Sequence, residues 1–175
     1  MLCLYIVEPG LWAQPDAALQ HFEFVRESLA DMHTDLQALG GALHIATGSV
    51  VEVLSALHAQ APFAELVSHM ETGNAFTYER DLAVAAWCRS KNLSWTELPS
   101  FGVVRRLKNR NTWQTRWEAH MAAPQAVLPA LHFVSPPSET PHLTPAMLQA
   151  PSGLHHNPAQ RQLGGRRLAV ETLHS

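Results

Sequence analysis

A group of polar side chains stands where a predicted strand meets a predicted helix, in 69-HMETGNAFTYERD-81. In an open parallel sheet, ligands bind just outside the carboxyl ends of the strands, and a helix N-terminus attracts anions. Gly73 allows a positive backbone angle in the turn. The candidate ligand-binding residues are His69, Glu71, Thr72 and Asn74. They predict a pocket for a polar heterocycle or a nucleotide, and the alternative is a polar loop that caps the helix.

Arg80 and Asp81 lie about one turn inside the helix that follows. Adjacent helical residues point about 100° apart, so we expect these two not to pair with each other. Instead we expect each of them to bond a partner on a different side of the helix. The alternative is that both are solvated charges.

Positive charge is concentrated in the second part of the chain. Residues 1–71 hold one basic and nine acidic residues, whereas residues 72–175 hold eleven basic and six acidic ones. The segment 101-FGVVRRLKNRNTWQTRW-117 has five basic residues, no acid and two tryptophans, Trp113 and Trp117. Such a mixture suits a phosphate-bearing partner such as a nucleic-acid backbone. The alternatives are a solvated loop and a Trp stripe that packs on the domain or on a neighbour.

Several common chemistries have no motif in this sequence. It contains no H-x-x-x-H on a helix, no C-x-x-C, no G-x-S-x-G, no Walker loop and no G-x-G-x-x-G. Hydrolase, kinase, dinucleotide-reductase and metal-site interpretations therefore lose support.

Hydrophobic periodicity predicts alternating strands and helices. Strands are expected at 2–7, 42–47, 65–69 and 93–98. Helices are expected at 16–41, started by an Asp16 cap and closed by Gly40-Gly41, and at 50–59 after a Ser49 cap. A third helix is expected at 77–91, with Leu82, Ala85, Ala86 and Trp87 facing the core. Such alternation is typical of an α/β fold, a Rossmann-like parallel sheet with helices on both faces.

The remainder of the chain has a different character. A short helix is expected at 112–121. Residues 122–165 carry eight of the twelve prolines and predict an interdomain linker. Residues 166–175 begin with another helical pattern. The expected domains are therefore 1–121, 122–165 as linker, and 166–175. The two cysteines lie in apolar segments, which favours reduced thiols and a cytoplasmic location.

Three segments together resemble the N-terminal α/β domain of the cryptochrome/DNA photolyase family. They are 5-YIVEPGLW-12, 69-HMETGNAFTYERDLAVAAWCRSKNLSWTELP-99 and 102-GVVRRLKNRNTWQTRWEAHM-121. The tail 163-LGGRRLAVETLHS-175 is similar to the segment that opens the family's second domain. The resemblance implies a light-dependent DNA-repair enzyme or a blue-light photoreceptor, in which a helical domain holds FAD and the α/β domain often carries an antenna chromophore.

The chain departs from that family at both ends. The family's first strand has no counterpart before Met1, so strands 2–7 and 65–69 are expected to lose their shared partner. The helical FAD-binding domain has no counterpart either, so we expect a domain truncated at both ends and inactive alone. Phe76 and Thr77 stand where folate-binding relatives have an Asn-Glu pair, which makes folate a less suitable antenna than a flavin or deazaflavin.

The residues and the resemblance together give one main hypothesis and two alternatives. The main hypothesis is the antenna or domain-docking α/β domain of a photolyase or cryptochrome, with Arg80 and Asp81 docking a C-terminal helical domain or a separate chain that carries it. DNA-backbone contact is assigned to Arg105, Arg106, Lys108 and Arg110. The alternatives are a stand-alone nucleotide- or flavin-binding module and a structural remnant without a ligand.

Overall fold

The computed structural model describes every residue except 100–102, 106, 138–142, 157–159 and 175. The described chain forms two compact units: Met1–Ala61 with Leu131–Ser175, and Pro62–Ala130. We call them the first and the second unit. The units do not divide the chain at 121 and 165, and the three domains expected from the sequence stay a prediction.

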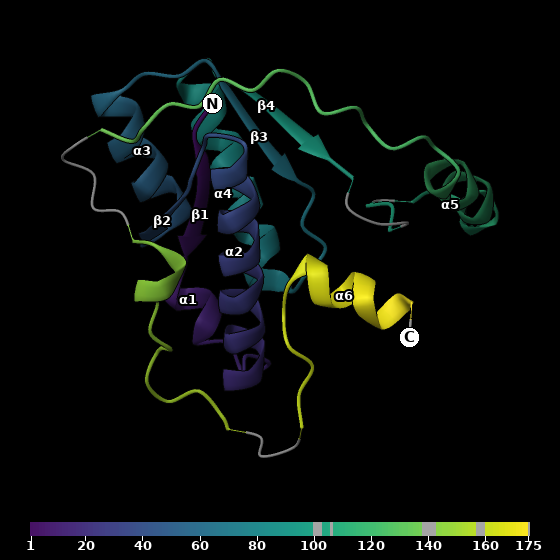
Figure 1. Cartoon of the computed structure of the whole chain (residues 1–175). Helices are drawn as coiled ribbons and strands as arrows, with labels where there is room; N and C mark the ends of the chain where they lie inside the picture. The colour runs from purple at the N-terminus through teal and green to yellow at the C-terminus, as the bar shows by residue number, and fades with distance from the viewer. Residues whose placement is uncertain (100–102, 106, 138–142, 157–159, 175) are drawn as a thin grey trace. The chain divides into compact units, whose positions relative to one another are not determined.

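The first unit is built around two parallel strands, β1 (Cys3–Val7) and β2 (Leu43–Thr47), paired in register from Cys3 with Leu43 to Val7 with Thr47. The long helix α2 (Leu19–Ala38) packs on this pair (Figure 1). α1 (Pro9–Trp12) and α3 (Val50–Gln60) follow the two strands in the chain. The core consists of Val7, Trp12, Phe22, Leu29, Leu43, Ile45 and Leu148.

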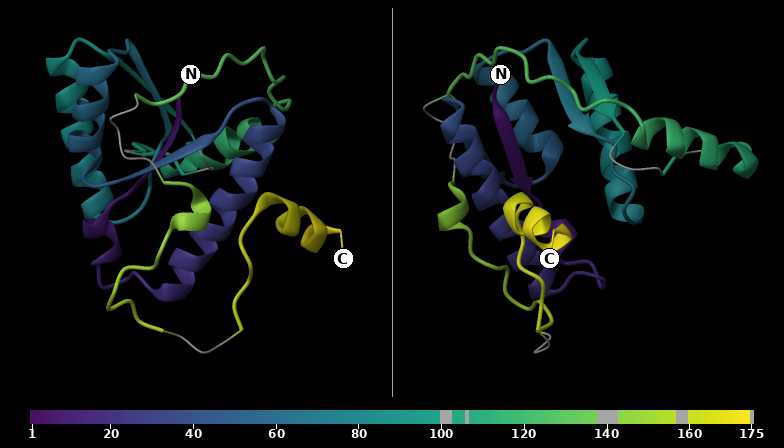
Figure 2. Two further views of the ribbon diagram at one scale, coloured as in Figure 1. Left: turned by 60° about the vertical axis from the view of Figure 1, so that its left-hand side comes forward. Right: turned by 45° about the vertical axis from the view of Figure 1, so that its right-hand side comes forward.

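The C-terminal segment is part of the first unit. Leu143 forms an antiparallel bridge with Ile45 of β2, and Leu148, just after the 3₁₀ turn η2 (Pro145–Met147), is buried in the core. Further on, the chain returns to α2 and ends in α6 (Arg166–Leu173) (Figure 2). From residue 131 on, the described part of the Pro-rich segment therefore packs on the core of the first unit, where Leu143 and Leu148 anchor it.

The start of α2 corrects one sequence expectation. The helix begins at Leu19 after an Ala18 N-cap that makes no side-chain cap, so Asp16 does not cap it. The Leu19 N–H instead donates to the His155 carbonyl at 2.9 Å. A distant backbone oxygen thus satisfies a donor that a local side chain was expected to satisfy. At the other end Gly40, with φ of 82°, closes the helix as predicted.

The second unit holds the other two strands, β3 (Glu65–His69) and β4 (Ser94–Leu98), which are parallel and paired from Glu65 with Ser94 to His69 with Leu98. Helix α4 (Ala75–Ser90) connects them. The 3₁₀ turn η1 (Arg110–Thr112) leads into α5 (Trp113–Met121).

The four predicted strands are confirmed and each pair is parallel, but the described residues form two two-stranded sheets and not one continuous sheet. Within α4, the expected inward face is correct for Trp87, which is buried with Val84 and Cys88, and wrong for Leu82, which is 50% exposed.

Candidate functional site

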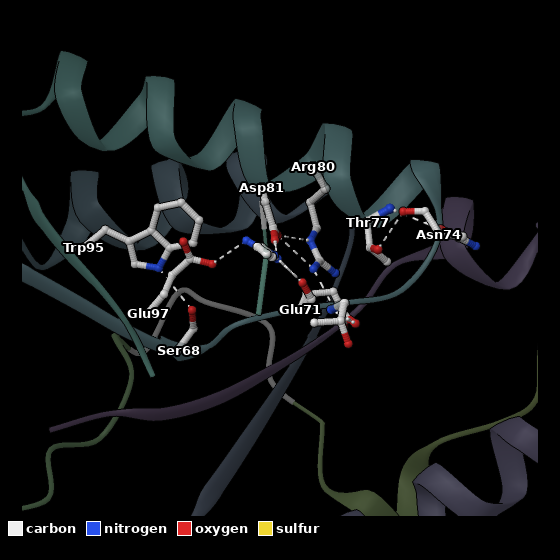
Figure 3. Close-up of polar contacts among 10 residues, drawn as sticks. Ser68, Glu71, Asn74, Thr77, Arg80, Asp81, Trp95 and Glu97 are labelled. Atoms are coloured by element: carbon white, nitrogen blue, oxygen red, sulfur yellow. Dashed lines mark hydrogen bonds and ion pairs between the residues drawn. The ribbon is translucent and has the colours of Figure 1, made fainter. Parts of the chain in front are cut away.

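The loop after β3 leads directly into α4, and Asn74 caps that helix. Its Oδ1 accepts from the Thr77 N–H at 3.2 Å, and the Thr77 hydroxyl donates to the Asn74 carbonyl at 2.9 Å (Figure 3). This is the capping role that the sequence left open as the alternative to ligand binding. The cap fixes where the loop ends, and therefore where the Glu71 and Thr72 side chains lie.

Gly73 is needed for space, not for an unusual backbone angle. The described glycines with positive φ are Gly40, Gly48, Gly153 and Gly165, so Gly73 does not use the positive angle that a glycine allows. A Cβ at Gly73 would instead lie 2.9 Å from Thr77 Oγ1 and 3.2 Å from Glu71 Oε1. The loop therefore passes so close to the first turn of α4 that a side chain does not fit without a shift.

Arg80 and Asp81 bond each other, which corrects the expectation that they do not pair. Arg80 Nη2 lies 2.9 Å from Asp81 Oδ1 and Arg80 Nε lies 3.1 Å from the same atom (Figure 3). The long guanidinium arm folds back along the helix and overcomes the angular separation of the two Cβ atoms. Arg80 Nη2 also lies 4.0 Å from the Glu71 carboxylate.

Arg105 connects three segments of the second unit. Its Nη2 bonds the second oxygen of Asp81 at 2.5 Å, and its Nη1 bonds Glu97 of β4 at 2.9 Å. Its Nε donates to the Glu71 carbonyl at 2.6 Å. Asp81 is only 8% exposed, so its charge needs these partners to offset the cost of its desolvation. The network joins the loop, α4 and β4.

A cavity of about 780 Å³ opens at this place. Glu71, Thr72 and Asn74 line it from the loop, and Tyr78 and Leu82 line it from α4. Trp95 and Val103 add further apolar surface. A volume of several hundred cubic ångströms, with apolar walls and a few polar groups, is typical of a small-molecule site.

The remaining predicted site residues lie elsewhere or are engaged. His69 is exposed at the end of β3 and does not line the cavity. Arg105 is committed to the ion-pair network, whereas Lys108 and Arg110 are exposed beside η1. Arg106 lies outside the described residues. The ligand, docking and DNA roles assigned to these residues stay predictions.

Sequence reasoning missed Glu97 and the structural role of Arg105. Arg105 is 24 residues from Asp81 and 34 from Glu71, so no local sequence pattern predicts these bonds. The sequence signal is the position of Asp81, three and seven residues before Val84 and Cys88 and therefore on the same helical face, where a buried acid requires a cationic partner. That signal calls for a cation but does not identify Arg105.

The fold has counterparts among known proteins. The family model for DNA photolyase matches residues 1–109. The chain belongs to the DNA photolyase family. The resemblance seen in the sequence is therefore confirmed. A search of curated proteins finds no match.

Three solved structures of the photolyase and cryptochrome group share the fold. A bacterial class III photolyase from Agrobacterium tumefaciens is 18% identical with a TM-score of 0.52, and the match covers 98% of this chain and 32% of that one. An archaeal photolyase from Sulfolobus tokodaii, solved with two FAD molecules, is 16% identical with a TM-score of 0.53, covering 67% and 28%. A Synechocystis cryptochrome is 13% identical with a TM-score of 0.55, covering 94% and 33%. The chain thus spans about a third of the length of these photolyase-family proteins.

Three further features of this photolyase-family chain concern membrane spans, metal ligands and cysteines. None of the described helices has the length and apolar character needed to cross a membrane. Among the described residues, no group of three His, Cys, Asp or Glu side chains is arranged to hold a metal ion. Cys3 and Cys88 are free thiols, and burial raises the pKa of both.

Proposed function

We propose that this domain holds a flavin or deazaflavin antenna chromophore in the second-unit cavity and serves a light-dependent DNA-repair or blue-light-sensing protein. The observation that carries the proposal is the cavity itself, which lies after the carboxyl end of β3 in a chain of the photolyase family. In such a protein the antenna would pass excitation energy to FAD held by a helical domain.

The chemistry of the cavity supports a flat, largely uncharged chromophore. The side chains of Tyr78 and Leu82 are 46% and 50% exposed and give apolar surface for a tricyclic ring. The ionised groups around it, three acids (Glu71, Asp81, Glu97) and three arginines (Arg80, Arg89, Arg105), leave no net charge. That balance gives no net attraction for a phosphate. We therefore expect riboflavin or a deazaflavin to bind at least as tightly as FMN or FAD.

Titration of the purified chain with these chromophores tests the proposal. Flavin fluorescence anisotropy should rise with riboflavin or 5-deazariboflavin, and folate should bind weakly or not at all. Leu82→Arg should abolish binding, because it places a long side chain in the cavity, whereas Ala83→Arg should leave it unchanged. Ala83 is the matched control since it lies on the same helix, is exposed and does not line the cavity. The same affinity in both variants, or none in the parent chain, would refute the chromophore site.

Docking of a helical FAD-binding domain, in the same chain or a separate one, is the second candidate role. Arg80 supports it, because its side chain remains 20% exposed at the edge of the ion-pair network. Co-expression with a helical domain of this family should give a complex that retains FAD on size exclusion. Arg80→Ala should weaken that complex more than Arg89→Ala, which removes an exposed arginine from the same helix. Equal loss in both would remove Arg80 from the docking surface.

Contact with a DNA backbone is assigned to Lys108 and Arg110, with Arg106 beside them in the sequence. Arg105 contributes by holding the segment, because its guanidinium is already bonded. Phosphate contact predicts affinity that falls as salt rises, measured by anisotropy with labelled duplex. A cytoplasmic location completes the proposal and can be followed with a fluorescent fusion.

A further inference from the structure

Helix α5 carries an aromatic stripe that the second unit does not bury. All nine of its residues are exposed, including Trp113 at 40%, Trp117 at 39% and Met121 at 62%. These three residues are four apart and share one helical face. The two indoles stack on each other, with ring centroids 6.0 Å apart and planes 23° apart. Each retains enough exposed surface to contact a second flat ring.

A helix of this length needs a partner to be stable. Nine residues are fewer than the roughly 12–15 that an isolated helix requires in water. Its apolar stripe is not buried by the described residues, because between 39% and 62% of each of its three side chains is exposed. A ligand that covers Trp113 and Trp117 would therefore stabilise both the stripe and the helix.

Unpaired positive charge borders the stripe and limits which ligand fits. Among the described residues, no ion pair involves Lys108, Arg110 or Arg116, in contrast to Arg105. The one acid of α5, Glu118, accepts a hydrogen bond from the Gln114 amide at 2.8 Å. The charge complement of this surface is therefore an anion.

A hollow of about 320 Å³ lies among the same residues. Lys108, Asn109, Thr112 and Arg116 line it, together with Val104, Leu107 and Arg105, whose guanidinium is already bonded to Asp81 and Glu97. The two remaining cations, with an amide and a hydroxyl beside them, are suited to a phosphate group and its sugar. This hollow and the indole pair occur within ten residues of each other in the chain, so one extended ligand can reach both.

We propose that Lys108, Arg110 and Arg116 together with Trp113 and Trp117 bind single-stranded nucleic acid. The cations take the phosphates, and unpaired bases stack on the indole faces, which is how sequence-tolerant single-strand sites combine charge and aromatic surface. A duplex keeps its base faces covered and can use only the cations. The inference deepens the DNA-contact part of the proposed function and is independent of the chromophore site.

Anisotropy titration of the full chain with labelled oligothymidylate tests the proposal. Trp113→Ala with Trp117→Ala should weaken binding about tenfold and leave the salt dependence unchanged. Lys108→Gln with Arg116→Gln should weaken binding and also reduce the slope of log affinity against log salt by about 1.4, because each phosphate that is no longer neutralised reduces it by about 0.7. The matched controls are Lys91→Gln, an exposed cation after α4, and Phe24→Ala, a 42% exposed aromatic residue of the first unit. Both should bind as the parent chain does, and circular dichroism checks that every variant is folded.

The competing ligands separate this inference from the broader DNA proposal. Tighter binding of oligothymidylate than of duplex or polyglutamate supports it. Duplex binding that the tryptophan variants do not change would keep the backbone contact and overturn the stacking. Equal binding of polyglutamate and oligothymidylate, unaffected by the tryptophan variants, would show a general anion surface and overturn it too. No nucleic-acid binding at all would remove both proposals and leave the chromophore site untouched.

Discussion

The two strand pairs of this protein are both parallel and five residues long, but their side chains have different surroundings. In the first unit, Leu43 and Ile45 of β2 are 4% and 0% exposed and pack under α2 with Phe22. In the second unit, Val67 of β3 and Leu98 of β4 are 53% and 44% exposed. The first pair is stabilised by apolar burial, whereas the second is connected to its helix and loop by ion pairs.

Backbone pairing alone therefore does not define a stable layer. In both pairs, five residues of one strand pair with five of the other. What differs is whether the side chains exclude water. The first unit should therefore respond most to loss of volume, and the second to loss of charge.

The largest effect is expected from Phe22→Ala. Phe22 is 2% exposed and meets Trp12 edge-on at a centroid distance of 5.0 Å. Removing its ring leaves a cavity and should lower the free energy of unfolding by about 4 kcal/mol, measured by urea denaturation followed by circular dichroism. Phe24→Ala on the same helix, at an exposed position, should change it by less than about 0.5 kcal/mol. Similar losses at both positions would contradict an apolar core in the first unit.

The next largest is expected from Asp81→Ala in the second unit. The change leaves Arg80 and Arg105 without their shared carboxylate and should cost about 3 kcal/mol. Hydrogen exchange of the β3 and β4 amides is the measurement, because it reports opening of that unit separately. Glu79→Ala removes an exposed acid of the same helix and serves as the control. Adding Arg105→Met to Asp81→Ala should recover part of the loss, and a fully additive loss would argue against the network.

A smaller effect is expected from Asn74→Ala, which removes the side-chain cap of α4. The loss should be about 1 kcal/mol, and Asn74→Asp should retain most of the stability because its oxygen can accept from the Thr77 N–H. Amide exchange in the first turn of α4 distinguishes the two variants. If they behave alike, Asn74 acts in the loop by something other than capping.

The smallest effect concerns the return of the tail to α2. Two contacts lower the pKa of Glu27 from 4.5 to about 2, against the opposing effect of burial. The Arg161 Nη1 donates to the Glu27 carboxylate at 2.9 Å, and the Gly164 N–H donates to it at 2.8 Å. Because the folded pKa is depressed, the contribution to stability is complete above pH 4.5 and is lost as the pH falls towards 2. The pair is partly exposed, so the change should be small. The Gly164 amide chemical shift should titrate in that window and become flat in Glu27→Gln; a midpoint near 4.5 would contradict the contact.

The regular elements and the cap of α3 were predictable from the sequence. The residues 65–69 were predicted as a strand and form one with the same bounds, and Ser49 caps α3 by accepting from the Glu52 N–H at 3.4 Å. Asp16 does not cap α2, because the Leu19 N–H donates to the carbonyl of His155, a residue that is distant in the chain.

The order and type of the elements, the membership in the photolyase family and the polar character of the loop after β3 were already contained in the sequence. Periodicity, caps and motifs are local properties, so they can be interpreted without coordinates. The fold was needed to establish that the strands pair two by two, that Arg105 bonds Asp81 and Glu97, and that Trp113 and Trp117 remain exposed. Those outcomes depend on groups that are distant in the chain, and the free energy of bringing them together is set by the burial and charge of the whole unit.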